Sequence, residues 1–340
     1  DFDVIVNDRE VDAVAETIGG VKVAYDYTKR ALLAGKHVVT SNKELVAVHG
    51  CELLKIAEEK NVNYLFEAAV GGGIPVLRPI QQCLAANEIE EVFGILNGTT
   101  NYILTRMVRG GVTFEAALRE AQAMGYAEQD PTADVEGHDA CRKICILADL
   151  AFGCEVPPEH VPTVGISGVT LRDVEIVEQA GWRVKLLGRV VRGENGCISA
   201  YVAPHLVQHP MAAVEDVFNA IMVRGNAVGE VMFYGPGAGK LPTASAVVAD
   251  VIDAAQHRGQ RKKIGWTVWD GAKIAPPTAL SMRCYFRVKD SIKAVETAFP
   301  ECEILSREGE TAFITPCMQL SELEERARSL QVCTRLCVLD

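Results

Sequence analysis

The sequence lacks several features that would each have indicated a particular class of protein. It has no GxGxxG run, no CxxC pair, and no apolar stretch of the roughly 18 residues that a membrane span requires. Basic side chains number 34 against 45 acidic ones, and the net charge of −11 argues against a nucleic-acid or anionic-membrane partner. Because the chain also begins without the basic and apolar segments of a secretory signal, we expect a soluble, cytoplasmic protein.

The eleven cysteines are scattered along the chain, and without CxxC spacing they do not predict a zinc ribbon. Reduced thiols in a reducing compartment are the simpler interpretation. The remaining composition, 49% hydrophobic and 23% charged over 340 residues, is that of an ordered globular chain. At about 100–200 residues per domain, this length predicts two or three domains.

Short strands alternate with amphipathic helices over the first eighty residues. The pattern predicts strands at 11–17, 37–40 and 63–67 and helices at 21–34 and 43–60. Such alternation is typical of βαβ units, and ligands of the resulting parallel sheet bind beyond the carboxyl ends of its strands. We therefore expect an α/β fold with a Rossmann-like parallel sheet.

Residues 89–105 are predicted to run from a strand into a helix, and polar side chains cluster at that junction. Asn97 ends the predicted strand, and Thr99 or Thr100 can cap the helix that follows. With Asn101, these side chains face whatever lies at the strand end. Capping alone is the alternative interpretation.

A denser polar segment follows, in which the pattern predicts a helix that starts near Asp130 and continues to about Phe152. Asp139 and Lys143 are four residues apart and therefore share one face of it. A solvated ion pair, worth only about 0.3–0.5 kcal/mol, is one explanation. The functional alternative gives Lys143 a proton-transfer role, since partial burial lowers the pKa of a lysine, with the Asp139 carboxylate orienting it.

These segments, taken in order, resemble the homoserine dehydrogenase family, whose NAD(P)-dependent members interconvert aspartate 4-semialdehyde and homoserine. The matching segments are ETIGG (16–20), AGKHVVTSNKELVA (34–47), FEAAVGGGIPVL (66–77), GILNGTTNYILTRM (94–107), GYAEQDPTADVEGHDACRK (125–143) and GPGAGKLPTASAVVADV (235–251).

The resemblance implies roles for individual residues. Lys143 is implied to be the catalytic group, which protonates the substrate oxygen when the aldehyde is reduced. Glu128 is implied to hold the substrate ammonium. Asp134, Asp139 and Lys43 are implied to complete the substrate site.

The family's ligands are implied at two further sets of positions. Contact with NADP or NAD is implied at Thr17, Ile18, Ser41, Lys43 and Gly239. A structural sodium ion, bound largely through backbone carbonyls, is implied at Glu67, Val70, Gly72 and Ile74.

The strand and GxGxxG turn that normally open a nucleotide-binding half are absent, so the predicted sheet lacks its first strands. Either the sequence is an N-terminally incomplete piece of the enzyme, or it has lost tight nucleotide binding. We favour incompleteness because the later motifs are intact. The residue that would choose between NAD and NADP lies in the same missing region.

We expect three parts in the chain. Residues 1–80 with 236–262 form the partial nucleotide-binding domain, and residues 81–235 form an α+β catalytic and dimerisation domain. Residues 278–340 follow a βαββαβ order, which is the ferredoxin-like arrangement. At this place in this family, the tail resembles an ACT regulatory domain.

The tail lacks the glycine-containing turn with which ACT domains often contact a ligand. It therefore either binds an effector, with threonine the natural candidate, or serves only to pair subunits in a homodimer or homotetramer. The predicted function is NAD(P)H-dependent reduction of aspartate semialdehyde in threonine, methionine and isoleucine biosynthesis. The alternatives are a catalytically impaired, amino-acid-binding regulatory protein with a vestigial nucleotide half, and another semialdehyde or malate-type dehydrogenase on the same scaffold.

Overall fold

Strands and helices alternate at the start of the chain, as the sequence pattern predicts. The computed structural model describes residues 1–193, 196–307 and 309–339. After α1 (Phe2–Asn7), strands β1 (Ala13–Glu16), β2 (His37–Thr40) and β3 (Tyr64–Leu65) pair in parallel in the order β1-β2-β3. Helices α2 (Lys22–Leu33) and α3 (Lys43–Glu59) connect them. The Rossmann-like parallel sheet is therefore confirmed.

The described chain divides into two units that are interleaved in sequence. Unit 1 comprises Asp1–Leu96, Arg142–Val161 and Ala220–Gly271. Unit 2 comprises Asn97–Cys141, Pro162–Asn219 and the chain from Ala272 onward. The three-part division expected from the sequence stays a prediction. No helix of the described ranges has the length and apolar character to cross a bilayer.

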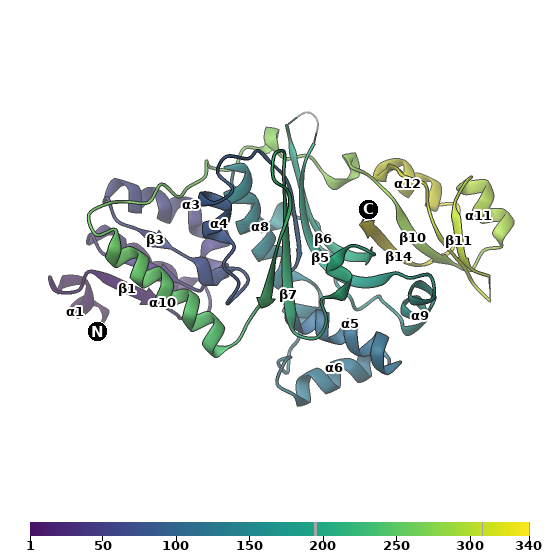
Figure 1. Cartoon of the computed structure of the whole chain (residues 1–340), viewed down its shortest axis with the longest axis horizontal. Helices are drawn as coiled ribbons and strands as arrows, with labels where there is room; N and C mark the ends of the chain where they lie inside the picture. Colours follow the sequence, from purple (N-terminus) through teal and green to yellow (C-terminus); the bar gives the residue numbers. More distant parts are fainter. Residues whose placement is uncertain (194–195, 308, 340) are drawn as a thin grey trace. The chain divides into compact units, whose positions relative to one another are not determined.

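The later elements of unit 1 include the helix that covers the parallel sheet. They are α4 (Leu77–Gln82), β4 (Ile89–Ile95), the greater part of α8 (His138–Phe152), β7 (Phe218–Gly225), β8 (Gly229–Pro236) and α10 (Lys240–Gln256). Strands β4 and β7 pair antiparallel. Helix α10 lies along the sheet, where Ala254 packs with Val39 and Leu65 (Figure 1). Helix α10 therefore belongs to the same unit as the parallel sheet.

Unit 2 begins with the elements α5 (Gly98–Gly110), α6 (Phe114–Ala123), α7 (Thr132–Val135), α9 (Leu171–Gln179), β5 (Arg183–Arg192) and β6 (Ile198–Val207). The single helix predicted from Asp130 to Phe152 is wrong. Helix α7 ends at Val135, and α8 begins only at His138. Between them Gly137 has a φ of 82°, a left-handed conformation that ends a helix and that glycine adopts without a steric penalty.

The tail of unit 2 has the predicted ferredoxin-like order. Its βαββαβ elements are β10 (Cys284–Val288), α11 (Ile292–Ala298), β11 (Glu303–Ser306), β12 (Thr311–Ile314), α12 (Leu320–Ala327) and β14 (Val332–Leu339). The strands lie in the order β11-β12-β10-β14, and β14 continues in parallel onto β6. A small separate sheet joins β9 (Ser281–Met282) to β13 (Met318–Gln319).

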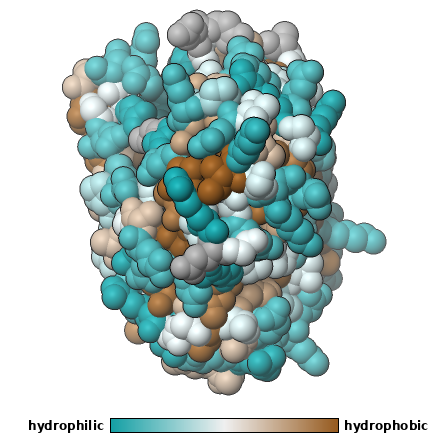
Figure 2. Space-filling model, turned by 90° about the vertical axis from the view of Figure 1, so that its right-hand side faces the viewer, coloured by the Kyte–Doolittle hydropathy of each residue, from teal (hydrophilic) through white to brown (hydrophobic). Residues whose placement is uncertain are grey.

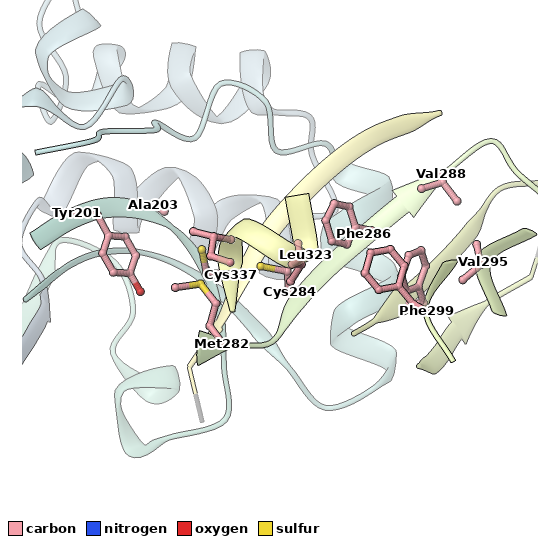
Figure 3. Close-up of a cluster of buried hydrophobic side chains, with 12 residues drawn as sticks. Tyr201, Ala203, Met282, Cys284, Phe286, Val288, Val295, Phe299, Leu323 and Cys337 are labelled. Carbon is pink, nitrogen blue, oxygen red and sulfur yellow. The ribbon is translucent and has the colours of Figure 1, made fainter. Parts of the chain in front are cut away.

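Aromatic and sulfur-containing side chains fill the core of the tail. In Figure 3, Phe286 and Phe299 lie toward the Val295 side of this cluster, and Met282 and Cys337 lie toward the Tyr201 side. Phe286 and Phe299 have ring centroids 5.9 Å apart. The surface in Figure 2, by contrast, is largely hydrophilic with smaller apolar patches.

Candidate active site

Asn97 is the residue around which the polar side chains of unit 2 are organised. Its Oδ1 accepts a hydrogen bond from the Thr100 amide at 2.9 Å, so Asn97 itself caps α5. The prediction that Thr99 or Thr100 caps the helix is therefore wrong. Asn97 is the last residue with extended backbone angles before the helix, and that is the position from which a side chain reaches the free amides.

The other end of the Asn97 side chain holds two carboxylates. Its Nδ2 donates to Asp134 at 2.7 Å and to Asp139 at 2.9 Å. The break between α7 and α8 makes this convergence feasible. On one continuous helix, residues five apart would point about 140° away from each other. Asp139 is 5% exposed and Asp134 is half-buried, so the pair forms a partly desolvated acidic group.

Lys143 lies in α8, one turn after Asp139, and its side chain is 9% exposed. Its Nζ donates to the carbonyl oxygen of Leu96 at 2.7 Å, and both residues belong to unit 1. The neighbouring Arg142 forms a 3.2 Å ion pair with Glu44 at the start of α3. Lys143 is thus a buried side chain whose Nζ donates to a main-chain carbonyl.

The positions implied for the cofactor lie where the parallel strands end. Thr17 and Ile18 follow β1 and are exposed, and half-buried Ser41 follows β2. Lys43 is the first residue of α3, and Gly239 immediately precedes α10 with a φ of 119°. This placement agrees with the rule that ligands of parallel sheets bind beyond the carboxyl ends of the strands.

A hydrogen-bond network fixes the chain at these strand ends. The Glu16 carboxylate accepts from Thr40 Oγ1 at 2.5 Å and from the Ile18 amide at 2.6 Å. Asn42, the N-cap of α3, donates from Nδ2 to the carbonyls of Ile18 and Gly20 at 3.0 and 2.7 Å. The turn after β1 is therefore rigidly held while its surface stays open.

The segment implied for sodium, 67–74, is buried apart from half-buried Gly73. The Glu67 carboxylate accepts from the amides of Val76, Leu77 and Arg78 at 2.6 to 2.9 Å. Both of its oxygens are thus engaged in fixing the start of α4. A cation in this segment would have to be held by main-chain oxygens of residues such as Val70, Gly72 and Ile74.

Glu128 and Asp130 lie in the loop between α6 and α7, and both are exposed. The main-chain oxygen of Glu128 accepts from Gln122 Nε2 at 3.1 Å. Asp130 accepts from the hydroxyl of Thr132 at 2.6 Å, a contact that lowers the pKa of Asp130. The buried acidic pair thus consists of Asp134 and Asp139, and Glu128 lies on the loop that precedes it.

Two further polar residues belong to this part of unit 2. Asn101, noted in the sequence only for its place after Asn97, donates to the carbonyls of Val214 and Phe218 at 3.1 Å each. The sequence pattern does not predict a role for Lys185 in β5, because a lysine between strand residues usually occupies an exposed position. It is 3% exposed.

Comparison with known proteins identifies the family. The homoserine dehydrogenase family model matches residues 75–252, and a model described as the homoserine dehydrogenase NAD-binding domain matches residues 1–67. The chain belongs to the homoserine dehydrogenase family.

Individual relatives agree with this family. The homoserine dehydrogenases of Bacillus subtilis and Pseudomonas aeruginosa are 47% and 50% identical to 73% and 74% of this chain, and the match covers 58% of each relative. The chain thus spans under two thirds of the length of these curated relatives. The crystal structure of a homoserine dehydrogenase from Thiobacillus denitrificans matches all of this chain and 85% of its own, with 35% identity and a TM-score of 0.89.

A second structural neighbour is a complex with a nicotinamide nucleotide. A hyperthermophilic archaeal homoserine dehydrogenase, described as a complex with NADPH, is 32% identical over 75% of this chain, with a TM-score of 0.65. The family is therefore established from both sequence and structure.

Proposed function

We propose that this protein is a homoserine dehydrogenase, which reduces aspartate 4-semialdehyde to homoserine reversibly with a nicotinamide nucleotide. Buried Lys143, which follows Asp139 by one turn of α8, is the observation that carries the proposal. Membership of the family and the NADPH complex of an archaeal relative support it. The comparisons do not favour a regulatory protein without catalysis.

The residues of the chain divide the chemistry between charge and proton transfer. Asp134 and Asp139, with Glu128 on the preceding loop, supply negative charge for the substrate ammonium. Lys143 supplies a proton to the carbonyl oxygen as negative charge develops there, and it accepts that proton back in the reverse direction. By binding the ammonium, the acidic residues orient the substrate and hold its reacting carbon in place. Such orientation raises the rate of the chemical step.

The nicotinamide nucleotide is proposed to bind at the ends of the parallel strands. A Cβ added at Gly19 or at Gly20 would meet no atom within 4 Å, so the turn after β1 leaves open space beside Thr17 and Ile18. Ser41, Lys43 and Gly239 are proposed to complete this contact. When bound, the nucleotide supplies the hydride.

Replacement of Lys143 by alanine tests the proposed reaction. We expect turnover of aspartate semialdehyde, followed by NADPH oxidation, to fall by about 10²–10⁴-fold, because general acid catalysis contributes on that order. Lys60→Ala, which removes an exposed lysine just after α3, is the control and should retain activity. Near-normal turnover of the Lys143→Ala protein would refute the assignment.

Two further features are proposed from the family resemblance. A sodium ion is proposed at the carbonyls of the 67–74 segment, where Gly71 and Gly72 have φ angles of 75° and 55° that reverse the chain. The tail is proposed to be an ACT-like module. Its strand order supports that proposal, and it either binds threonine or pairs subunits into a homodimer or homotetramer.

A further inference from the structure

Lys185 lies in β5 with its side chain enclosed within unit 2. Its Nζ donates to Oδ1 of Asn101 at 2.9 Å and to the carbonyl oxygen of Val214. Both acceptors are neutral groups. Burying an ammonium against neutral acceptors costs free energy that an aliphatic side chain would not, so the lysine is unlike an ordinary strand residue.

The acceptors of Lys185 fasten α5 to the turn that follows Ala213. Asn101 donates to Val214 and to Phe218, at opposite ends of that turn. One helical turn further on, the Thr105 hydroxyl accepts from the Asp216 amide at 3.1 Å. Lys185 therefore connects three elements, namely β5, α5 and the 214–218 turn.

The same face of α5 leads to the proposed substrate site. Asn101 and Thr105 are four residues apart on one side of α5, and Asn97 is the N-cap at the start of the same helix. Asn97 holds Asp134 and Asp139, while Asn101 and Thr105 hold the 214–218 turn. A shift of α5 would therefore carry Asn97 with the start of the helix.

Close packing leaves this arrangement little freedom. A Cβ added at Gly98 would lie 2.7 Å from the carbonyl oxygen of Val217, so the first turn of α5 rests directly on the 214–218 turn. Asp216 has a φ of 55°, a strained conformation for a residue other than glycine, which the surrounding bonds must maintain.

We propose that Lys185 is a positioning residue for the reaction proposed above: it orients α5 through Asn101 and Val214, and thereby sets the direction in which Asn97 presents Asp134 and Asp139. This inference depends on the proposed function for its effect on catalysis. The geometric part, a link from β5 to the first turn of α5, does not.

Charged groups from neighbouring elements act on Lys185. Burial lowers its pKa to about 8, while Glu215 and Asp216 raise the pKa and Arg183 and Arg109 lower it. The ammonium thus loses its charge just above neutral pH, and its hold on Asn101 and Val214 weakens there. An arginine at this position would stay charged over the same range.

The variant Lys185→Met tests the proposal with two measurements. We expect the KM for aspartate semialdehyde to rise by about tenfold with a smaller change in kcat, because displaced acidic residues weaken substrate positioning. Amide hydrogen exchange at Thr100, whose N–H bonds Asn97, should accelerate by about the same factor. Adding Asn101→Leu should change both measurements by less than the sum of the two single effects, because Lys185 and Asn101 share one hydrogen bond.

Val190→Ala is the matched control, because Val190 is fully buried on the same strand. It should lower stability without changing the KM or the Thr100 exchange rate. If Lys185→Met matches Val190→Ala in both measurements, the proposal is overturned. Faster Thr100 exchange in a protein whose wild type does not reduce aspartate semialdehyde would instead uphold the positioning role and refute the proposed function. Should Lys185→Met not fold, Lys185→Gln is measured in the same way, with the same expected result.

Discussion

Burial shifts the pKa of individual side chains in this protein, and His205 is one of them. His205 in β6 is fully buried, with Nδ1 2.8 Å from the carbonyl oxygen of Ala203 and Nε2 3.4 Å from the Tyr201 hydroxyl. Burial lowers its pKa to about 3. His205 is therefore a neutral imidazole that packs within the sheet.

The state of His205 predicts sensitivity to acid. The unfolded chain takes up a proton at this histidine below about pH 6.5, whereas the folded protein does not until about pH 3. Between these values the free energy of unfolding should fall as the pH falls, by up to about 1.4 kcal/mol per pH unit. Urea unfolding at pH 7, 6 and 5 measures this slope.

His205→Gln is the comparison for that measurement, because glutamine is neutral throughout and can still donate to Ala203. Its stability should decline less steeply between pH 6 and 5 than that of the wild type. Parallel slopes for the two proteins would show that His205 does not titrate as expected.

At the scale of elements, the break between α7 and α8 matters most for the site. The loop after Pro162 stabilises it. The Ile166 amide donates to the carbonyl oxygen of Val135 at 2.8 Å, and a Cβ at Gly165 would lie 2.1 Å from the same oxygen. This close backbone contact locks the end of α7 and therefore the place of Asp134.

Gly165→Ala should disturb this contact severely. The added methyl group would clash with backbone atoms of Val135 and Glu136, which cannot rotate away as a side chain could. We therefore expect a loss of about 1–3 kcal/mol in the free energy of unfolding. Substrate binding should weaken as well, because Asp134 moves with α7. Urea unfolding and the KM for the aldehyde measure the two effects.

Gly168→Ala provides the control, since no atom lies within 4 Å of its added Cβ and its φ is not left-handed. It changes the same loop in the same way and should be close to neutral. Equal effects of the two substitutions would contradict the importance of the Gly165 contact.

At the scale of the whole molecule, a buried ion pair joins the tail to the rest of unit 2. Arg287 Nε in β10 donates to Asp173 Oδ1 in α9 at 2.7 Å, and Tyr285 donates to the same oxygen at 3.0 Å. Burial raises the pKa of Asp173, but bonds from Arg287 and Thr170 outweigh burial and leave the pKa below its ordinary value. The tail is thus bound by charge as well as by the pairing of β14 with β6.

Arg287→Met should therefore destabilise more than the tail alone. Removing one partner of a buried ion pair costs about 3–5 kcal/mol, because the other charge stays buried. We expect amide exchange to accelerate both in the tail and in β5 and β6. Arg335→Met, which breaks the exposed pair with Glu324, should cost less than about 1 kcal/mol. Acceleration confined to the tail would show that it unfolds as a separate domain.

Local patterns in the sequence predicted much of this architecture. The alternating strands and helices of the first eighty residues and the βαββαβ tail both follow from short-range periodicity and turn chemistry. The candidate residues Asp139 and Lys143 also follow from their spacing on one helix. The roles given to the site residues stay predictions until they are measured.

What the sequence by itself determined is the order of the elements and the family, because both are properties of neighbouring residues along the chain. Only the tertiary structure decided that Asn97 caps α5 while binding Asp134 and Asp139, that Gly137 divides the expected helix, and that Lys185 is buried. The bonds from Asn97 to the two carboxylates and the enclosure of Lys185 depend on residues tens of positions apart. Hydrogen bonding and burial between such distant residues leave no periodic pattern in the chain.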